Sequence, residues 1–307
     1  MLRRITTILC VIVLAVMTAA DSGRAEEEWG QELLREEFHQ SYPLPADGRI
    51  SLHNINGAVR IAGWDRSEVK VDAVKRATTR ERLDEAMIEI NASGDRLDIR
   101  TRYPEERWRE HKGVRNPASV EYTLTIPRGA RLEAVELING ALDIEGLTGE
   151  VNGSSINGRV AARGLTGPVK LSTINGLLEA EFAQLGERVS LNSVNGQVAL
   201  VVPSDANAQI KASTVHGSIS NSLGLPVRRG RFVGTNLAGQ LGTGGPRVSL
   251  SNVNGTINVR RASDGRQPSP AVNQLEPAAD SEGVVSEVEI EREVAREVER
   301  EMRAAQR

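Results

Sequence analysis

An Asn-Gly pair recurs every 18–21 residues between Gly140 and Gly217, with further copies at Gly57 and Gly255. This repeat constrains the fold more than any other feature. Aliphatic residues stand two positions before and two positions after each glycine. A regular period of this length is the signature of stacked structural repeats. The pairs are Asn56-Gly57, Asn139-Gly140, Asn157-Gly158, Asn175-Gly176, Asn195-Gly196, His216-Gly217 and Asn254-Gly255, with His in place of Asn in one copy.

Within each copy, apolar residues alternate with other residues, which is typical of strands with one buried face. In the copy around Gly176, Val169 and Leu171 lie seven and five positions before the glycine. Ile174 and Leu178 lie two positions on either side of it. The two sets differ in phase by one residue, and such a slip moves side chains to the opposite face of a strand. We therefore predict a corner just before each Asn-Gly pair, with aliphatic side chains pointing into one core on both sides.

Two arrangements satisfy this pattern. Asn-Gly is a strong hairpin signal because both residues tolerate positive φ, so a meander of hairpins is one of them. The other is a β-solenoid whose coils turn at stacked Asn-Gly corners, and the near-constant period favours it. We predict an all-β, β-helix-like solenoid with coils of roughly 18–21 residues, a small α+β N-terminal part and a charged C-terminal helix. The corner asparagines would then stack as a structural ladder of side-chain amides.

Composition divides the chain into six segments. They are a signal peptide at 1–25, an N-terminal acidic segment at 26–49, a strand-rich part with one short helix at 50–130, the Asn-Gly repeat solenoid at 131–261, a linker at 262–281 and a charged helix at 282–307.

The first segment carries the features of an export signal. Arg3 and Arg4 precede an apolar run at 5–17, and small residues follow it. The run is shorter than the ~20 residues that a membrane span needs. We predict cleavage after Ala20 or Ala25, which places the protein in the periplasm or at the cell surface.

Local signals predict further elements. The acidic run at 26–39 favours a short helix, and Thr78-x-x-Glu81 is a capping box that predicts another. Alternation predicts a strand pair at 87–91 and 96–102 and a strand at 119–127. Residues 103–117 are polar and indicate a surface loop. The stretch 218–247 lacks Asn-Gly, and we expect a degenerate corner at 237–241.

The C-terminal segment 282–307 is rich in Glu and Arg. Its apolar residues alternate at spacings of four and three, interrupted by Glu291, which predicts a helix. One interpretation is docking to a partner or self-association, and the other is a solvated charged helix. The apolar positions are Val284, Val288, Ala295, Val298, Met302 and Ala305.

The sequence indicates no cofactor and no metal site. The single cysteine, Cys10, lies in the predicted signal, and the four histidines lack metal-ligand spacing. Cleavage after Ala25 removes three arginines and one aspartate, so the formal net charge changes from −3 to −5. An acidic chain does not suit a nucleic-acid partner.

Carboxylates on the solenoid raise the alternative of a carbohydrate-active enzyme, because glycoside hydrolysis needs two carboxylates held at a defined separation. Outward positions of two coils carry such groups, with Arg163 in the coil between them. We interpret them as a charge-complementary ladder on a solvent face rather than as a catalytic pair. The carboxylates are Asp143, Glu145, Glu179 and Glu181.

Three stretches together resemble a bacterial protein family. They are Ile-Asn-Gly-Ala-Val-Arg-Ile-Ala-Gly-Trp-Asp at 55–65, Val-Glu-Tyr-Thr-Leu-Thr-Ile-Pro-Arg-Gly-Ala at 120–130 and Leu-Gly-Thr-Gly-Gly-Pro-Arg-Val-Ser-Leu-Ser-Asn-Val-Asn-Gly-Thr-Ile at 241–257. Over about residues 50–260, the combination is similar to exported β-strand-repeat proteins of unknown function called putative adhesins. The resemblance implies a β-solenoid without established catalytic residues. The charged C-terminal segment and the missing Asn-Gly in 218–247 depart from that pattern.

These observations lead to one functional hypothesis and two alternatives. We expect a non-enzymatic, adhesin-like binding or scaffold protein of the bacterial cell envelope, with an envelope protein or a glycan as its partner. The alternatives are a carbohydrate-active β-helix enzyme and a regulatory or sensor partner of a membrane complex that acts through 282–307.

Overall fold

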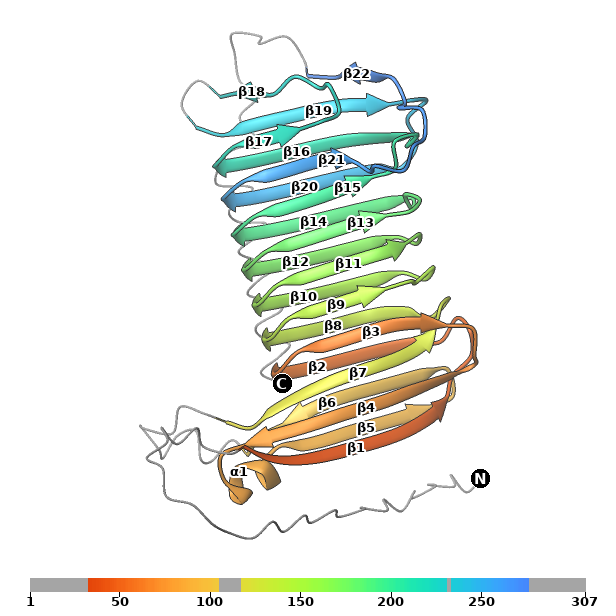
Figure 1. The fold of residues 1–307 in the computed structure, drawn as a ribbon, viewed down its shortest axis with the longest axis vertical. Coiled ribbons are helices and arrows are strands. Elements are labelled where there is room, and N and C mark those ends of the chain that lie inside the picture. The colour runs from red at the N-terminus through yellow and green to blue at the C-terminus, as the bar shows by residue number, and fades with distance from the viewer. Residues whose placement is uncertain (1–32, 105–116, 231–232, 276–307) are drawn as a thin grey trace, which may run out of the picture. The chain divides into compact units, whose positions relative to one another are not determined.

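Two β-sheets face each other across one apolar core, and their strands stack rung upon rung (Figure 1). This computed structural model describes residues 33–104, 117–230 and 233–275, all within one unit that begins at Leu33. Among these residues the only helix is α1 (Arg80–Glu85). The prediction of an all-β, solenoid-like fold is therefore confirmed, and the structure adds that the strands pair largely in parallel.

We call the two sheets A and B. In the described residues, sheet A has ten strands in the order β1 (Leu34–Pro43), β4 (Glu68–Ala77), β7 (Ser119–Pro127), β3 (Val59–Trp64), β9 (Leu142–Glu145), β11 (Val160–Leu165), β13 (Leu178–Phe182), β15 (Val198–Val202), β21 (Ile257–Arg261) and β17 (Ile219–Asn221). The main path of sheet B follows the order β18 (Arg228–Arg229), β19 (Thr235–Leu241), β16 (Ala208–His216), β20 (Arg247–Asn254), β14 (Arg188–Asn195), β12 (Val169–Asn175), β10 (Val151–Asn157), β8 (Arg131–Asn139), β2 (Arg49–Asn56), β6 (Arg96–Arg102) and β5 (Met87–Ser93). The remaining strand of sheet B, β22 (Ala271–Asn273), pairs with β19.

Each coil consists of one strand from each sheet, joined at the Asn-Gly pair. In the coil of β10 and β11, the first strand ends at Asn157 and the second begins at Val160. Asn157 is in parallel register with Asn139 of one neighbouring coil and Asn175 of the other. The turn therefore lies at the glycine and the residue after it, not just before Asn-Gly as predicted.

The side-chain directions also differ from the prediction. In β12, Val169, Leu171 and Thr173 are buried, whereas Lys170, Ser172 and Ile174 are only partly buried. Alternation thus continues unbroken to the end of the strand and sends Ile174 outward. The expectation that the aliphatic residue two before each glycine points into the core is wrong. The small polar residue three before the glycine occupies the inward position instead.

Chain order and spatial order diverge at both ends of the repeat array. The last copy, in β20 and β21, lies between the coil of β14 and β15 and the coil of β16 and β17. The early copy, in β2 and β3, lies beside β8 and β9. Pairing is parallel through all seven coils. Antiparallel strands flank the array, including β4 and β1 in sheet A and β19 in sheet B.

The N-terminal region is not the separate α+β part that the sequence predicted. Its strands extend the same two sheets, and α1 contributes six residues capped by Thr79, whose hydroxyl accepts from the Arg82 amide at 3.4 Å. The predicted capping residue, Thr78, lies one position earlier. The strand pair at 87–91 and 96–102 and the strand at 119–127 are confirmed as β5, β6 and β7.

Two other local predictions are wrong. The helix expected within 26–39 is replaced from Leu34 onward by β1, which pairs with β4 along its whole length because edge pairing satisfies its backbone groups. The degenerate corner expected at 237–241 is the straight strand β19, antiparallel to β16. The predicted signal peptide, most of the loop predicted at 103–117 and the predicted helix at 282–307 lie outside the described residues.

The Asn-Gly turns predict a sharp effect of adding one methyl group. A Cβ on Gly158 would overlap the Gly140 carbonyl oxygen of the coil below, and the same contact recurs at other turns of the array. We expect Gly158→Ala to destabilise the protein by about 1–3 kcal/mol, because the stacked backbones must separate. Unfolding followed by circular dichroism measures this. Gln197→Ala, at an exposed turn position, should change stability by less than about 0.5 kcal/mol. Equal melting temperatures for Gly158→Ala and the native protein would contradict the stacking argument.

Candidate binding surface

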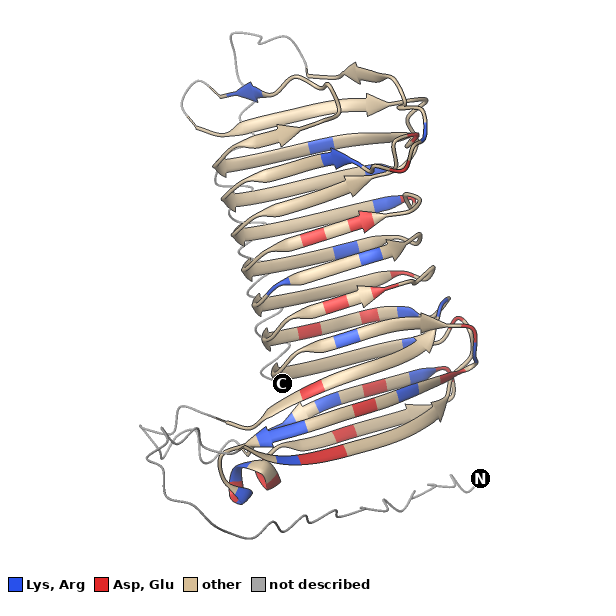
Figure 2. Cartoon of the chain, in the orientation of Figure 1, with Lys and Arg blue, Asp and Glu red and all other residues tan. Residues whose placement is uncertain are grey.

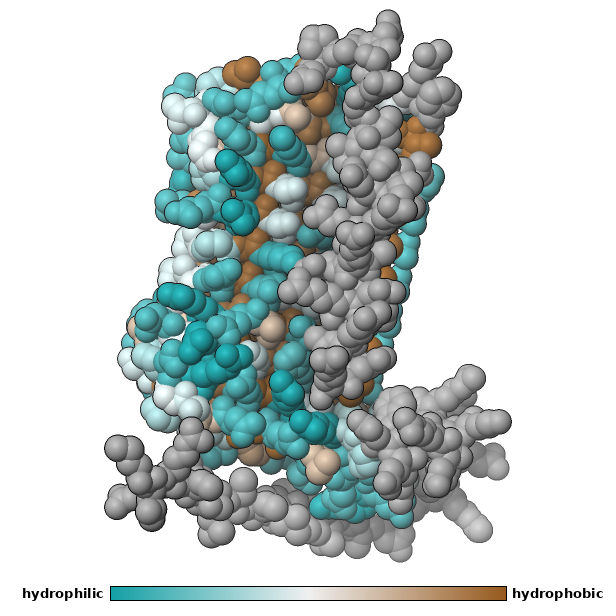
Figure 3. Space-filling model, turned by 180° about the vertical axis from the view of Figure 1, so that it is seen from behind, coloured by the Kyte–Doolittle hydropathy of each residue, from teal (hydrophilic) through white to brown (hydrophobic). Residues whose placement is uncertain are grey.

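The outward aliphatic residues of sheet B form one continuous row, which we call the aliphatic row. Each lies two positions before a turn glycine, on the face opposite the core. None of them belongs to the main apolar core cluster or packs against it. Five are partly buried, and Val253 and Val215 are buried, with 9% and 8% of their surface exposed. Apolar surface runs between polar side chains across successive strands in Figure 3. In spatial order the row consists of Ile55, Ile138, Ile156, Ile174, Val194, Val253 and Val215, on β2, β8, β10, β12, β14, β20 and β16.

A row of mostly small polar residues runs beside the aliphatic row on the same face. Its members lie four positions before each glycine and are two residues from the aliphatic side chain on the same strand. The row consists of His53, Glu136, Ser154, Ser172, Asn192, Ser251 and Ser213.

On the other side of the aliphatic row, six asparagines form a ladder of hydrogen-bonded side-chain amides. Each Nδ2 donates to the Oδ1 of the asparagine in the next coil, and every bond points the same way. Aligned amides polarise one another, so each bond strengthens its neighbours. The distances are 3.0 Å from Asn139 to Asn56, 2.9 Å from Asn157 to Asn139, 2.9 Å from Asn175 to Asn157, 3.1 Å from Asn195 to Asn175 and 3.0 Å from Asn254 to Asn195.

His216 occupies the next position after Asn254 in the stack. The two residues are in parallel register, and the Gly255 amide donates to the His216 carbonyl at 3.0 Å. The imidazole is exposed at this turn. The sequence-predicted corner residues therefore occupy equivalent turns in all seven coils, at one edge of sheet B.

Inside the core, small polar residues hold the turns from beneath. Ser155 Oγ donates to the Gly140 carbonyl at 3.0 Å, and Thr173 Oγ1 donates to the Gly158 carbonyl at 3.2 Å. Asn252 Nδ2 makes the equivalent bond in the last copy. These bonds are part-buried and satisfy turn carbonyls that lie next to the core, where an unpaired group is costly. They also explain why small polar side chains fill buried positions.

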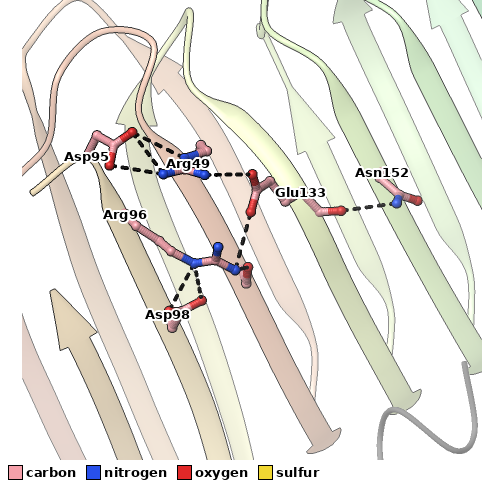
Figure 4. A network of polar contacts seen from close by, with 7 residues as sticks. Arg49, Asp95, Arg96, Asp98, Glu133 and Asn152 are labelled. Atoms are coloured by element: carbon pink, nitrogen blue, oxygen red, sulfur yellow. Dashed lines mark hydrogen bonds and ion pairs between the residues drawn. The ribbon is translucent and has the colours of Figure 1, made fainter. Parts of the chain in front are cut away.

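Charged groups concentrate toward the N-terminal strands and thin out along the repeats (Figure 2). At the ends of the sheet B strands that lie away from the asparagines, two arginines share the Glu133 carboxylate (Figure 4). Arg49 lies 3.7 Å from it and Arg96 lies 3.3 Å from it. Arg49 also bonds Asp95, and this contact holds the pKa of the Asp95 carboxyl below its usual range. All these groups are substantially exposed, so the network orders β2, β6 and β8 more than it stabilises them.

The four carboxylates considered for catalysis lie in two parallel rows on sheet A. Arg163 is in register between Glu145 and Glu181, as the sequence predicted. A cation that sequence reasoning missed, Arg159 in the Asn-Gly turn, lies 2.8 Å from Asp143 and 3.9 Å from Glu179. The position of Arg159 directly after the turn glycine Gly158 was the sequence signal that could have revealed this cation. Rows of this kind spread charge along the stack instead of converging on one point.

The histidines stand apart from one another. His39 lies 2.7 Å from Asp72 and 3.1 Å from Glu37, and these contacts raise its pKa. His53 lies 2.9 Å from Glu136.

Over 33–104, 117–230 and 233–275, no group of three or more acidic, His or Cys side chains could hold a metal ion. No helix in these ranges is long and apolar enough to cross a membrane. His111 lies outside them.

Residues 134–260, from β8 to β21, match the family model described as Toastrack DUF4097. The match covers most of the repeat array, and the resemblance to this class of proteins seen in the sequence is thereby confirmed. No protein with a curated description matches the sequence significantly.

Several solved structures are similar to the chain at low identity. A putative cell adhesion protein from Clostridium sporogenes ATCC 15579 shares 12% identity with a TM-score of 0.44, over 74% of this chain and 100% of that one. A putative adhesin from Bacteroides fragilis NCTC 9343 shares 12% identity with a TM-score of 0.37, over 74% and 97%. A putative lipid binding protein from Parabacteroides distasonis ATCC 8503 shares 10% identity with a TM-score of 0.26, over 74% and 97%. Similarity at this level assigns no ligand.

The amide ladder predicts an unusual pH response for Asn175→Asp. The introduced carboxylate can accept from Asn195 but has no hydrogen to donate to the Asn157 oxygen. We expect its pKa in the folded state to rise above the unfolded value, because only the protonated form can donate. Relative to the native protein, the variant should therefore be least destabilised below about pH 4 and lose about 1–3 kcal/mol as pH rises through the folded pKa.

Chemical denaturation at pH 3 and pH 7 measures this difference. Asn207→Asp is the matched control, because the Asn207 oxygen only accepts, from the Thr243 amide and hydroxyl. A carboxylate can keep both bonds, so its pH trend should be flat or reversed. The same trend in both variants would contradict the directional ladder.

Proposed function

We propose that this protein is an exported, non-enzymatic binding or scaffold protein of the bacterial cell envelope, adhesin-like in its mode of action. The observation that carries the proposal is the aliphatic row beside the asparagine ladder. Seven coils present the same residue types at steps of ~4.8 Å. A surface of this kind suits an extended partner that meets each coil in turn.

The energetics favour repeated weak contacts over one deep site. Removing one of the partly buried Ile or Val side chains fully from water contributes at most about 1 kcal/mol. Several such contacts along the row add up to a useful affinity, and losing one weakens binding only in part. The neighbouring small polar side chains can hydrogen-bond a polar rim, which resembles the composition of protein interfaces. An envelope protein with an apolar face suits this surface better than a glycan does.

The export proposal is supported by the basic, apolar and small-residue stretches in 1–25. On this proposal the mature chain contains no cysteine and folds without a disulfide. We propose the six-segment division of the sequence on the same grounds, with 282–307 as the part that contacts a partner or the chain itself.

A carbohydrate-active enzyme is the less favoured alternative. The paired carboxylates that such chemistry needs are ion-paired with Arg159 or placed in open rows on sheet A. A regulatory partner of a membrane complex is compatible with the same surface and would act through 282–307.

Substitution of the aliphatic row tests the binding role. We expect Ile156→Asp with Ile174→Asp to lose retention of an envelope component, because two carboxylates would be buried against the partner's apolar face. The measurement is a pull-down from a native envelope extract, compared quantitatively with the native chain. Asp143→Asn with Glu179→Gln, on sheet A, is the matched control and should keep retention. Equal retention by both double variants, or loss only in the control, would sink the assignment of this surface.

Export makes a separate prediction. The protein recovered from the periplasm or medium of an expressing bacterium should begin at Asp21 or Glu26, because cleavage follows Ala20 or Ala25. Intact-mass spectrometry distinguishes these two forms from the uncleaved chain. Recovery of the full-length chain from the cytoplasm alone would refute export.

A further inference from the structure

The aliphatic row matches in length a segment of the chain that lies outside the described residues. The row crosses seven adjacent strands of sheet B, so it extends over six steps, or ~29 Å. In the C-terminal segment 282–307, the apolar pattern begins at Val284 and ends at Ala305. An α-helix rises 1.5 Å per residue, so this pattern extends over ~31 Å.

The spacing of the two surfaces matches as well. Apolar positions of the segment recur every 3.5 residues on average, which is ~5.3 Å along a helix. Strands in sheet B recur every ~4.8 Å. Counting Glu291, the segment has seven such positions, and the row has seven aliphatic side chains. A helix laid along the row would therefore place about one side chain over each coil.

The chain leaves the stack at the correct end for this arrangement. The stretch expected as a linker is hydrogen-bonded to the stack as far as Gln274, whose amide donates to the Ala238 carbonyl. β22 pairs with β19, which pairs with β16, so the exit lies two strands, ~10 Å, beyond Val215. β22 is antiparallel to β19 and so runs in the same direction as β16, toward the edge that carries the asparagine ladder.

The connection is also long enough. Eight residues lie between Leu275 and Val284, and the nine Cα-to-Cα steps that join the two residues reach up to ~30 Å in an extended chain. The segment can therefore begin over Val215 and run along the row toward Ile55.

We propose that residues 282–307 form a helix that docks on the aliphatic row of its own chain, with Val284 over Val215 and Ala305 over Ile55. This inference rests on the proposed function in that it concerns the same surface, and it adds regulation. The docked segment covers the row in the free protein, and an envelope partner must displace it. Glu291 puts a carboxylate where an apolar side chain would bind more tightly, so the segment is exchangeable.

Cysteine crosslinking in the full-length chain tests the docking. Cys10→Ser leaves only introduced thiols. The matched pairs are Val253→Cys with Val288→Cys and Ile138→Cys with Met302→Cys. The mismatched pair is Val253→Cys with Met302→Cys, and Ala199→Cys with Val288→Cys places one thiol on the outer face of sheet A. With a short bismaleimide, the matched pairs should form an internal crosslink at least about tenfold faster, because docking raises their effective concentration above that of a free tether.

Two outcomes would overturn the proposal. Similar rates for all pairs would mean that the segment samples the surface without docking. Crosslinked products of twice the chain mass would mean that a second copy occupies the row. If the internal crosslinks form but the native chain retains no envelope component in the pull-down, the binding role is refuted and the docking stands. If the pull-down retains a component but the matched pairs do not crosslink faster, the docking is refuted and the binding role stands.

Proteolysis provides a second measurement without cysteines. In the otherwise native chain, Ile156→Asp with Ile174→Asp should speed trypsin cleavage at Arg292, Arg296 and Arg300 by about tenfold or more, because the segment loses its docking surface. Cleavage within 105–116 is the internal reference and should keep its rate. An unchanged rate at the three arginines would also overturn the proposal.

Discussion

The close backbone contact between successive Asn-Gly turns is the constraint on which the rest of the structure depends. At Gly158, the carbonyl oxygen of the coil below lies where a Cβ would be, and only glycine allows the two turns to approach so closely. This contact fixes the register of each coil on the next. The asparagine ladder outside, the polar bonds beneath the turns and the aliphatic row on the face all follow from it, because each repeats at one position per coil.

The stacked coils could be predicted well from the sequence, since the period and the Asn-Gly pairs locate each turn to within about two residues. Sequence reasoning gave the wrong side-chain direction, relative to the core, for Ile174 and Thr173. An outward isoleucine and an inward threonine reverse the usual rule, and only the hydrogen bond from Thr173 to the Gly158 carbonyl makes the inward polar residue favourable. Sequence reasoning also gave no strand order, because near-identical copies carry no information about which copies are neighbours. The acidic start of β1 was interpreted as a helix, since its pairing with the distant strand β4 leaves no signal in the local sequence.

The same regularity shapes what the surface can do. Catalysis gathers unlike groups around one point, whereas stacked coils place like groups in lines. Asp143 and Glu179 occupy equivalent positions two coils apart, and Arg159 lies between them as a bridging cation. A partner long enough to follow several coils would therefore gain more from this surface than a small molecule would.

The position of the last repeat has a consequence for how the protein matures. β20 and β21 lie between coils that precede them in the chain, so the coil of β16 and β17 has no direct neighbour among the earlier repeats. Assembly from the N-terminus can proceed through β14 and β15, and it must then wait until residues 247–261 emerge. During synthesis the array thus retains an open, unfinished end until residues 247–261 have been made, and the last repeat then closes it by pairing with coils on both sides.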